Sequence, residues 1–135
     1  MTSEISTENP KLRTDRVRTL GLITKKPSIS QEEFERHWLE KHSKLVLSLD
    51  IVQKNLLKYE QLHVNEQTKS LLQSLGLTLI DCDGIGILEA ESYEKLFEVF
   101  NDPEFKAVIG SDEERFLDRS KTRMIPLDFI AFIDK

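Results

Sequence analysis

The 135-residue sequence is poor in several features, and each shortage excludes a class of structure or function. Cys82 is the single cysteine, so no disulfide can form within the chain, as is typical of a reducing compartment. No apolar run reaches the ~18 residues of a membrane span, and the polar residues 1–13 lack the apolar stretch of a signal peptide. These shortages predict a soluble, cytoplasmic protein with no membrane partner.

Basic charge is scarce as well. Lys and Arg number 19 against 24 Asp and Glu, which gives a formal net charge of −5. Contacts with nucleic-acid phosphates need a basic face, so we expect no nucleic-acid partner. The chain also lacks Gly-x-Gly-x-x-Gly, a Walker-type loop and Gly-x-Ser-x-Gly, so we expect no nucleotide cofactor.

What is present is a hydrophobic content of 39%, arranged in an order of elements that predicts one α+β domain. β-Prone residues predict strands over 17–24, 56–64, 81–90 and 124–133. Ser30, three residues before Glu33, has the form of a capping box and opens a helix over 31–49. Ser92 opens a second helix that ends before Pro103, residues 104–120 form another helical stretch, and a short helix ends at Gly76.

The order strand, helix, strand, strand, helix, strand is that of the ferredoxin-like β-α-β-β-α-β fold, whose antiparallel sheet carries its helices on one face. The other face would be apolar and would need a partner sheet. We expect residues 1–14 to be a flexible tail and residues 15–135 to be a single domain. Gly84 and Gly86 within the third strand indicate a bulge, or close approach by a ligand or a second backbone.

Few residues in the sequence have the chemistry and position for acid–base work. His42 lies on the apolar stripe of the first helix, one turn after Trp38, where burial can tune an imidazole. This position fits a proton-transfer residue or a hydrogen-bonded core histidine, and the second is the commoner case. Tyr59 and His63 share one face of the second strand about 13 Å apart, with Gln61 between them as a polar contact. Tyr59 also fits a core aromatic, and His63 a surface residue at the strand end.

Other candidates have weaker signals. Asp83 could orient a histidine or lie at a pocket rim, and it also fits a simple turn residue. His37 is five residues from His42, not the four that would place both on one helical face, so we expect no metal site. Cys82 fits a small buried hydrophobe better than a nucleophile, because no base is adjacent.

Several segments together resemble EthD-type domains, in an order and spacing that cover residues 15–134. The segments are Lys26-Pro27-Ser28-Ile29-Ser30, Glu33-Phe34-Glu35-Arg36-His37-Trp38 with Lys41-His42, Lys58-Tyr59-Glu60-Gln61 with His63, Asp83-Gly84-Ile85-Gly86, and Asn101-Asp102-Pro103-Glu104-Phe105. The resemblance implies a homodimer whose two sheets face each other as a dimeric α+β barrel. It also implies a pocket between each sheet and its own helices.

The resemblance further implies a chemistry. Similar fungal members are decarboxylases or dehydratases that tailor aromatic polyketides, bacterial relatives include lactone isomerases, and these proteins usually work without metal or organic cofactor. Related isomerases use a histidine at the place of His42. We therefore expect a cofactor-independent lyase of secondary metabolism, with His42 as acid/base, and Tyr59 and His63 holding a carbonyl or phenol oxygen. The expected substrate contacts are Trp38, Gln61, Asp83, Phe97 and Phe116.

Two alternatives remain open at this point. One is a polyketide cyclase or isomerase on the same fold, and the other is a non-catalytic protein that binds a hydrophobic metabolite. The sequence does not decide between decarboxylation and dehydration, nor which of His42 and His63 is the principal acid/base.

Overall fold

A computed structural model describes residues 9–135 and contains a four-stranded antiparallel sheet in the order β2-β3-β1-β4. The expected ferredoxin-like arrangement is confirmed. The elements in chain order are β1 (Val17–Ile23), α1 (Gln31–Arg36), the π-helical segment η1 (His37–His42), α2 (Ser43–Ser48), α3 (Asp50–Asn55), β2 (Leu56–His63), α4 (Glu66–Ser74), β3 (Gly84–Ala90), α5 (Tyr93–Asn101), α6 (Pro103–Phe116) and β4 (Arg123–Leu127).

Local sequence signals start the helices that cover the sheet. Ser30 accepts a hydrogen bond from the Glu33 N–H, and Ser92 accepts one from the Lys95 N–H, so both residues cap their helices as their type predicts. Asp102 caps α6, and Pro103 stands at its first position, where a missing N–H has no cost. These caps fix where α1, α5 and α6 enter the layer above the sheet.

Several predicted boundaries are wrong. The helix expected over 31–49 is divided into α1, η1 and α2, and a further helix, α3, precedes β2. β3 starts at Gly84 rather than at residue 81. α6 ends at Phe116 rather than at residue 120, because Leu117 is extended and bridges to Lys25. β4 ends at Leu127, which pairs with Arg18, rather than at residue 133.

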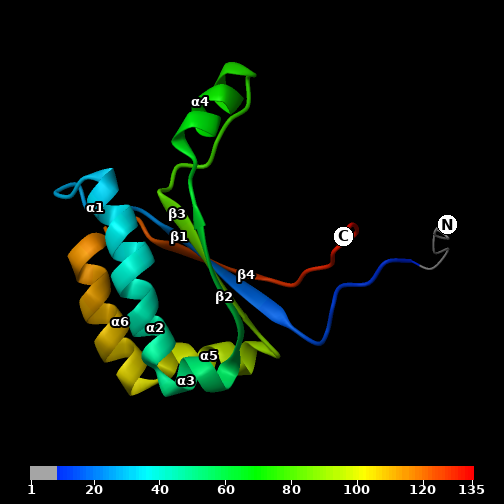
Figure 1. The fold of residues 1–135 in the computed structure, drawn as a ribbon. Helices are drawn as coiled ribbons and strands as arrows, with labels where there is room; N and C mark the ends of the chain where they lie inside the picture. The colour runs from blue at the N-terminus through cyan, green and yellow to red at the C-terminus, as the bar shows by residue number, and fades with distance from the viewer. Residues whose placement is uncertain (1–8) are drawn as a thin grey trace.

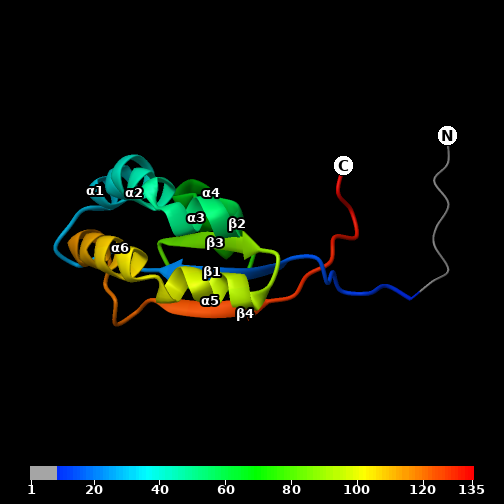
Figure 2. The same cartoon turned by 90° about the horizontal axis from the view of Figure 1, so that it is seen from below.

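The two faces of the sheet differ in what covers them. Figure 1 shows α1, α2, α3, α5 and α6 gathered on one side of the sheet, with α4 projecting beyond it. Figure 2 shows α5 in front of the strands and α6 beside their ends. Because strand side chains alternate, Gly21, Tyr59, Gly86 and Met124 face the helices, while their strand neighbours face away. The uncovered face carries the apolar residues Leu20, Leu22, Leu62, Ile85 and Ile125.

The expectation of a flexible tail concerns residues 1–14, of which 1–8 lie outside the described part of the chain. Residues 9–14 form neither helix nor strand. Arg13 is nevertheless tied to the C-terminal segment, because its backbone N–H donates to the Phe129 carbonyl over 2.9 Å and its guanidinium lies 5.4 Å from the Phe129 ring centre.

Candidate active site

A cavity of about 130 Å³ lies between the sheet and the helices. An apolar cavity of roughly this size can take up one six-membered ring of a larger molecule. Aromatic and aliphatic side chains make most of its wall, and the groups that can exchange a proton are few. The lining residues are Gly21, Ile23, Trp38, His42, Val46, Tyr59, Gly86, Leu88, Phe105, Ile109, Glu113, Phe116, Leu117, Thr122 and Met124. We call this the inner cavity.

His42 reaches the inner cavity from η1 and is held from behind by a buried carboxylate. Its Nδ1 lies 2.8 Å from Oδ2 of Asp112 on α6. A carboxylate only accepts, so Nδ1 carries the proton and Nε2 of the neutral ring is left as the basic nitrogen. Nε2 has no hydrogen-bond partner among residues 9–135. Burial lowers the pKa of His42, and Asp112 partly opposes this, so the ring is neutral and able to accept a proton at pH 7.

The same carboxylate binds His37, which corrects the sequence interpretation. Nε2 of His37 lies 2.9 Å from Oδ1 of Asp112, so one carboxylate accepts from both imidazoles. The prediction that a five-residue spacing separates the two histidines assumed an α-helix. In η1 the Ser43 N–H donates to the Trp38 carbonyl five residues earlier, so residues five apart come onto one face.

Tyr59 enters the inner cavity from β2 at the end of a short hydrogen-bonded chain. Nε2 of Gln61 donates to the Tyr59 oxygen over 3.1 Å and to the Trp38 carbonyl over 2.8 Å. Oε1 of Gln61 accepts from Nε2 of His63 over 2.9 Å, so Gln61 does lie between the two residues as expected. Because Gln61 already donates to it, the Tyr59 hydroxyl keeps its own proton to donate to a ligand. Burial raises the pKa of Tyr59, which keeps that proton in place at neutral pH.

The glycines of β3 shape this region. A Cβ at Gly84 would lie 2.5 Å from the Trp38 ring, so only a glycine lets the indole approach the strand this closely. A Cβ at Gly86 would meet nothing within 4 Å, because Gly86 lies under the inner cavity. The Trp38 ring also packs against His63 at a tilt, with ring centres 4.4 Å apart, and His63 lies beside the cavity wall rather than in it.

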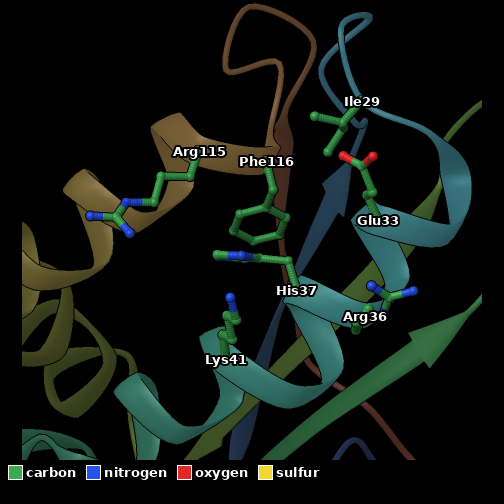
Figure 3. A pocket seen from close by; sticks show the side chains of 7 residues that line it. All are labelled: Ile29, Glu33, Arg36, His37, Lys41, Arg115 and Phe116. Carbon is green, nitrogen blue, oxygen red and sulfur yellow. The ribbon is translucent and has the colours of Figure 1, made fainter.

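A second cavity, of about 200 Å³, shares Phe116 with the inner cavity, and Figure 3 shows the side chains that line it. We call this the outer cavity. Its lining comprises Ile29, Glu33, Arg36, His37, Lys41, Arg115 and Phe116. The His37 ring lies against Phe116 with centres 4.7 Å apart, and His42 lies 5.0 Å from the same ring. Asp112 therefore joins one histidine at each cavity. The outer cavity is bordered by solvent-exposed cations, whereas the inner one is mostly apolar and suits an aromatic ring.

Two of the expected substrate contacts lie away from the inner cavity. Asp83 has the strand parity of the uncovered face, and its carboxylate accepts from the Lys25 N–H over 2.7 Å, so it stabilises a turn. Phe97 is 54% exposed on α5 and packs on Tyr93 with ring centres 6.4 Å apart. The expectations that Asp83 orients a histidine and that Phe97 lines the pocket are therefore wrong. Trp38 and Phe116 line the cavity, and Gln61 acts on it through Tyr59.

Sequence reasoning missed the two acidic residues that matter most here. Phe105, Ile109, Asp112 and Phe116 recur at helical spacing, so Asp112 falls on the apolar stripe of α6. Its neighbour Glu113 lines the inner cavity and is half-buried. A carboxylate on an apolar stripe was the signal that could have found them.

Cys82 is buried, and burial raises the pKa of its thiol. Both observations agree with a small hydrophobe rather than a nucleophile. Within residues 9–135, no group of three or more His, Cys, Asp and Glu side chains is arranged to hold a metal ion. In the same range no helix is both long enough and apolar enough to cross a membrane.

Comparison with known proteins decides the family. Residues 26–120 match the EthD domain. The chain belongs to the EthD family. The decarboxylase claH of Passalora fulva is 26% identical over 104 residues, which are 74% of this chain and 67% of that protein. The dehydratase ustZ of Ustilaginoidea virens is 27% identical over 107 residues, which are 75% of this chain and 74% of that protein.

Solved structures agree on the fold of this EthD domain. An EthD family protein from Bacillus halodurans has a TM-score of 0.59 at 14% identity and covers 85% of this chain and 99% of its own. A dimeric protein of ferredoxin-like fold from Bacteroides fragilis has a TM-score of 0.61 at 12% identity and covers 88% of this chain and 100% of its own. At these identities the likeness concerns the fold alone.

Proposed function

We propose that this EthD domain is a lyase that removes carbon dioxide or water from an aromatic polyketide, with His42 as the acid/base. The observation that carries the proposal is the Asp112–His42 pair, whose free Nε2 belongs to a ring that lines an apolar cavity. The names of its relatives claH and ustZ, a decarboxylase and a dehydratase, support the same reaction class. The aromatic wall suits a flat, ring-bearing substrate.

Both reactions pass through an enol or enolate, and the site has a group for each part of that step. His42 takes or returns a proton at carbon through Nε2, and Asp112 stabilises the imidazolium that forms. The Tyr59 hydroxyl donates to the oxygen on which negative charge develops. This division makes His42 the principal acid/base. His63 then acts indirectly, because its contact with the site is the Gln61 amide that positions Tyr59.

We also propose that the protein works as a homodimer whose uncovered sheet faces meet. Leu20, Leu22, Leu62, Ile85 and Ile125 on that face are exposed or half-buried in the single chain, and such a face is stabilised by a second sheet. The Bacteroides fragilis protein of the same fold is described as dimeric. Light scattering should give twice the mass of one chain, and a monomer at micromolar concentration would contradict this part.

The test compares the wild-type protein with a His42→Asn variant on a panel of aromatic polyketide acids and β-hydroxy ketones, followed by mass spectrometry. Asn keeps an N–H donor near the place of Nδ1 and removes the base at Nε2. We expect loss of carbon dioxide or water with the wild type, and a rate lower by about 10²–10⁴ in the variant with a similar KM. Lys44→Gln, an exposed change on the neighbouring α2, is the control.

Three outcomes would contradict the proposal. A variant that keeps the wild-type rate would remove His42 from the chemistry. A product of unchanged mass would indicate a cyclase or isomerase. Tight binding without conversion at any pH would indicate a metabolite-binding protein.

A further inference from the structure

We propose that Glu113 is the acid partner of His42 and protonates a leaving hydroxyl, so that the substrate is a β-hydroxy ketone and the reaction is a dehydration. This inference rests on the proposed function and adds a residue, a substrate class and a choice between its two reactions.

Asp112 and Glu113, two neighbouring carboxyls of α6, lie in different surroundings. Asp112 is buried and accepts hydrogen bonds from His37 and His42, so both of its oxygens are engaged. Glu113, one position on, lines the inner cavity together with His42 from η1 and Tyr59 from β2. Base, oxyanion donor and carboxyl thus reach one cavity from three different elements.

The surroundings of Glu113 favour its protonated form. Within residues 9–135 its carboxyl has neither a hydrogen-bond donor nor a salt-bridge partner, and the cavity wall beside it includes Phe105, Ile109 and Leu117. Burial raises the pKa of Glu113, and the charge of Asp112 raises it further, while Arg119 opposes the shift. When two neighbouring carboxyls have environments this different, one can stay ionised and the other protonated. Here Asp112 stabilises the charge on His42, and Glu113 donates the proton.

The cavity wall also distinguishes between the two reactions. Its described lining contains a glutamate and no lysine or arginine. A substrate carboxylate would enter without a counter-charge and next to another carboxyl, which is unfavourable in an apolar site. A neutral hydroxy ketone meets no such penalty, because its ketone accepts from Tyr59 and its hydroxyl accepts from Glu113.

The dehydration then balances as follows. Nε2 of His42 takes a proton from the carbon beside the ketone, and the electron pair moves into the enolate, whose oxygen is bound by Tyr59. The enolate expels the hydroxyl, which takes the Glu113 proton and leaves as water. His42 is left protonated and Glu113 ionised, and exchange with solvent restores both.

The experiment uses two probes that give the same product, 1-naphthol. 3-Hydroxy-1-tetralone, the β-hydroxy ketone, forms it by losing water and then tautomerising. 1-Hydroxy-2-naphthoic acid forms it by losing carbon dioxide. Wild type, Glu113→Gln and Glu114→Gln are compared on both probes over a range of pH. Glu114 is the matched control, because it is the next residue of α6 but is exposed and does not line the inner cavity.

We expect wild type to prefer the hydroxytetralone and Glu113→Gln to lose about 10²–10⁴ of that rate, with Glu114→Gln unchanged. The wild-type rate should be bell-shaped in pH, since His42 must be neutral and Glu113 protonated. In Glu113→Gln one limb should vanish, leaving a rate that rises with pH as His42 loses its proton. The groups that face Glu113, which are His42, Tyr59, Asp112 and Arg119, all remain in that variant.

Cooperative thermal unfolding shows whether each variant is folded. A Glu113→Ala variant supplemented with acetate gives a second test, because a small carboxylic acid should restore part of the rate.

A Glu113→Gln protein with the wild-type rate and both pH limbs would overturn the inference while leaving the His42 proposal intact. Preference for the naphthoic acid would overturn the dehydration assignment. A wild type that converts neither probe would contradict the proposed function itself, and the inference with it.

Discussion

Replacing Asp112 by Asn tests the hydrogen bond that leaves Nε2 of His42 as the basic nitrogen. The change preserves the shape of the side chain and replaces one hydrogen-bond acceptor by a donor. In the wild type both carboxylate oxygens accept, over 2.8 Å from Nδ1 of His42 and over 2.9 Å from Nε2 of His37. An amide accepts through its oxygen and donates through its nitrogen. One of the two imidazoles must therefore turn an unprotonated nitrogen towards it.

The size of the fall in kcat in Asp112→Asn depends on which histidine changes its tautomer. If His42 does, its proton moves to Nε2 and the base is lost, a change that costs about 10⁴ in kcat in a Ser-His-Asp triad. If His37 does, His42 keeps its tautomer but exchanges a charged partner for a neutral one. Hydrogen bonds to charged groups contribute roughly 1 kcal/mol more than neutral ones, so the rate should fall about fivefold to tenfold.

Steady-state kinetics on a converted probe, with nitrogen NMR of the His42 tautomer, distinguishes the two cases. Asp50→Asn, an exposed change at the start of α3, serves as the control. We expect kcat to fall in Asp112→Asn while KM changes little. A variant with full kcat and an unchanged His42 tautomer would refute the reasoning.

Three further predictions follow from the same geometry. Tyr59→Phe removes the phenol hydroxyl proposed to bind the developing charge, and should lower kcat by about 10²–10³ without unfolding the protein, as kinetics and thermal melts will show. Gly86→Val should fold and lose binding because its side chain fills the inner cavity, whereas Gly84→Ala should lose about 1–3 kcal/mol of stability through contact with Trp38; urea unfolding of both variants checks the contrast. Because the folded-state pKa of His42 lies below its ordinary 6.5, its contribution to stability is complete above pH 6.5 and is lost as pH falls through the folded value. Urea unfolding between about pH 7 and pH 5 should show this loss in wild type and a smaller one in His42→Asn.

The parts of the fold that depend on local pattern could be predicted from the sequence. Capping residues gave the helix starts at Ser30 and Ser92, and alternation placed Tyr59, Gln61 and His63 on one face of β2. Boundaries set by a distant partner could not be predicted. β4 ends at Leu127, opposite Arg18 near the start of β1, and nothing within residues 124–133 signals that limit.

The site shows a similar division. An apolar stripe predicted that His42 faces the interior, and it does. The shared contact of His37 and His42 with Asp112 could not be predicted. A π-helical turn places residues five apart on one helical face, and no residue pattern in the sequence indicates such a turn. Asp83 was misplaced by assuming that residue 81 begins the strand and that its face looks toward the pocket. Asp112 and Glu113 had a readable signal in the stripe of α6, which suggests that acidic residues on apolar helix faces should be examined first.

The most direct test of the central claim, that Nε2 of His42 moves a proton at carbon, uses a ketone that cannot eliminate anything. α-Tetralone in deuterated water reports removal of the proton beside its carbonyl as loss of one proton NMR signal, with no leaving group involved. The account predicts fast exchange with wild type and with Glu113→Gln, and exchange at the uncatalysed rate with His42→Asn. Exchange by His42→Asn at the wild-type rate would contradict it.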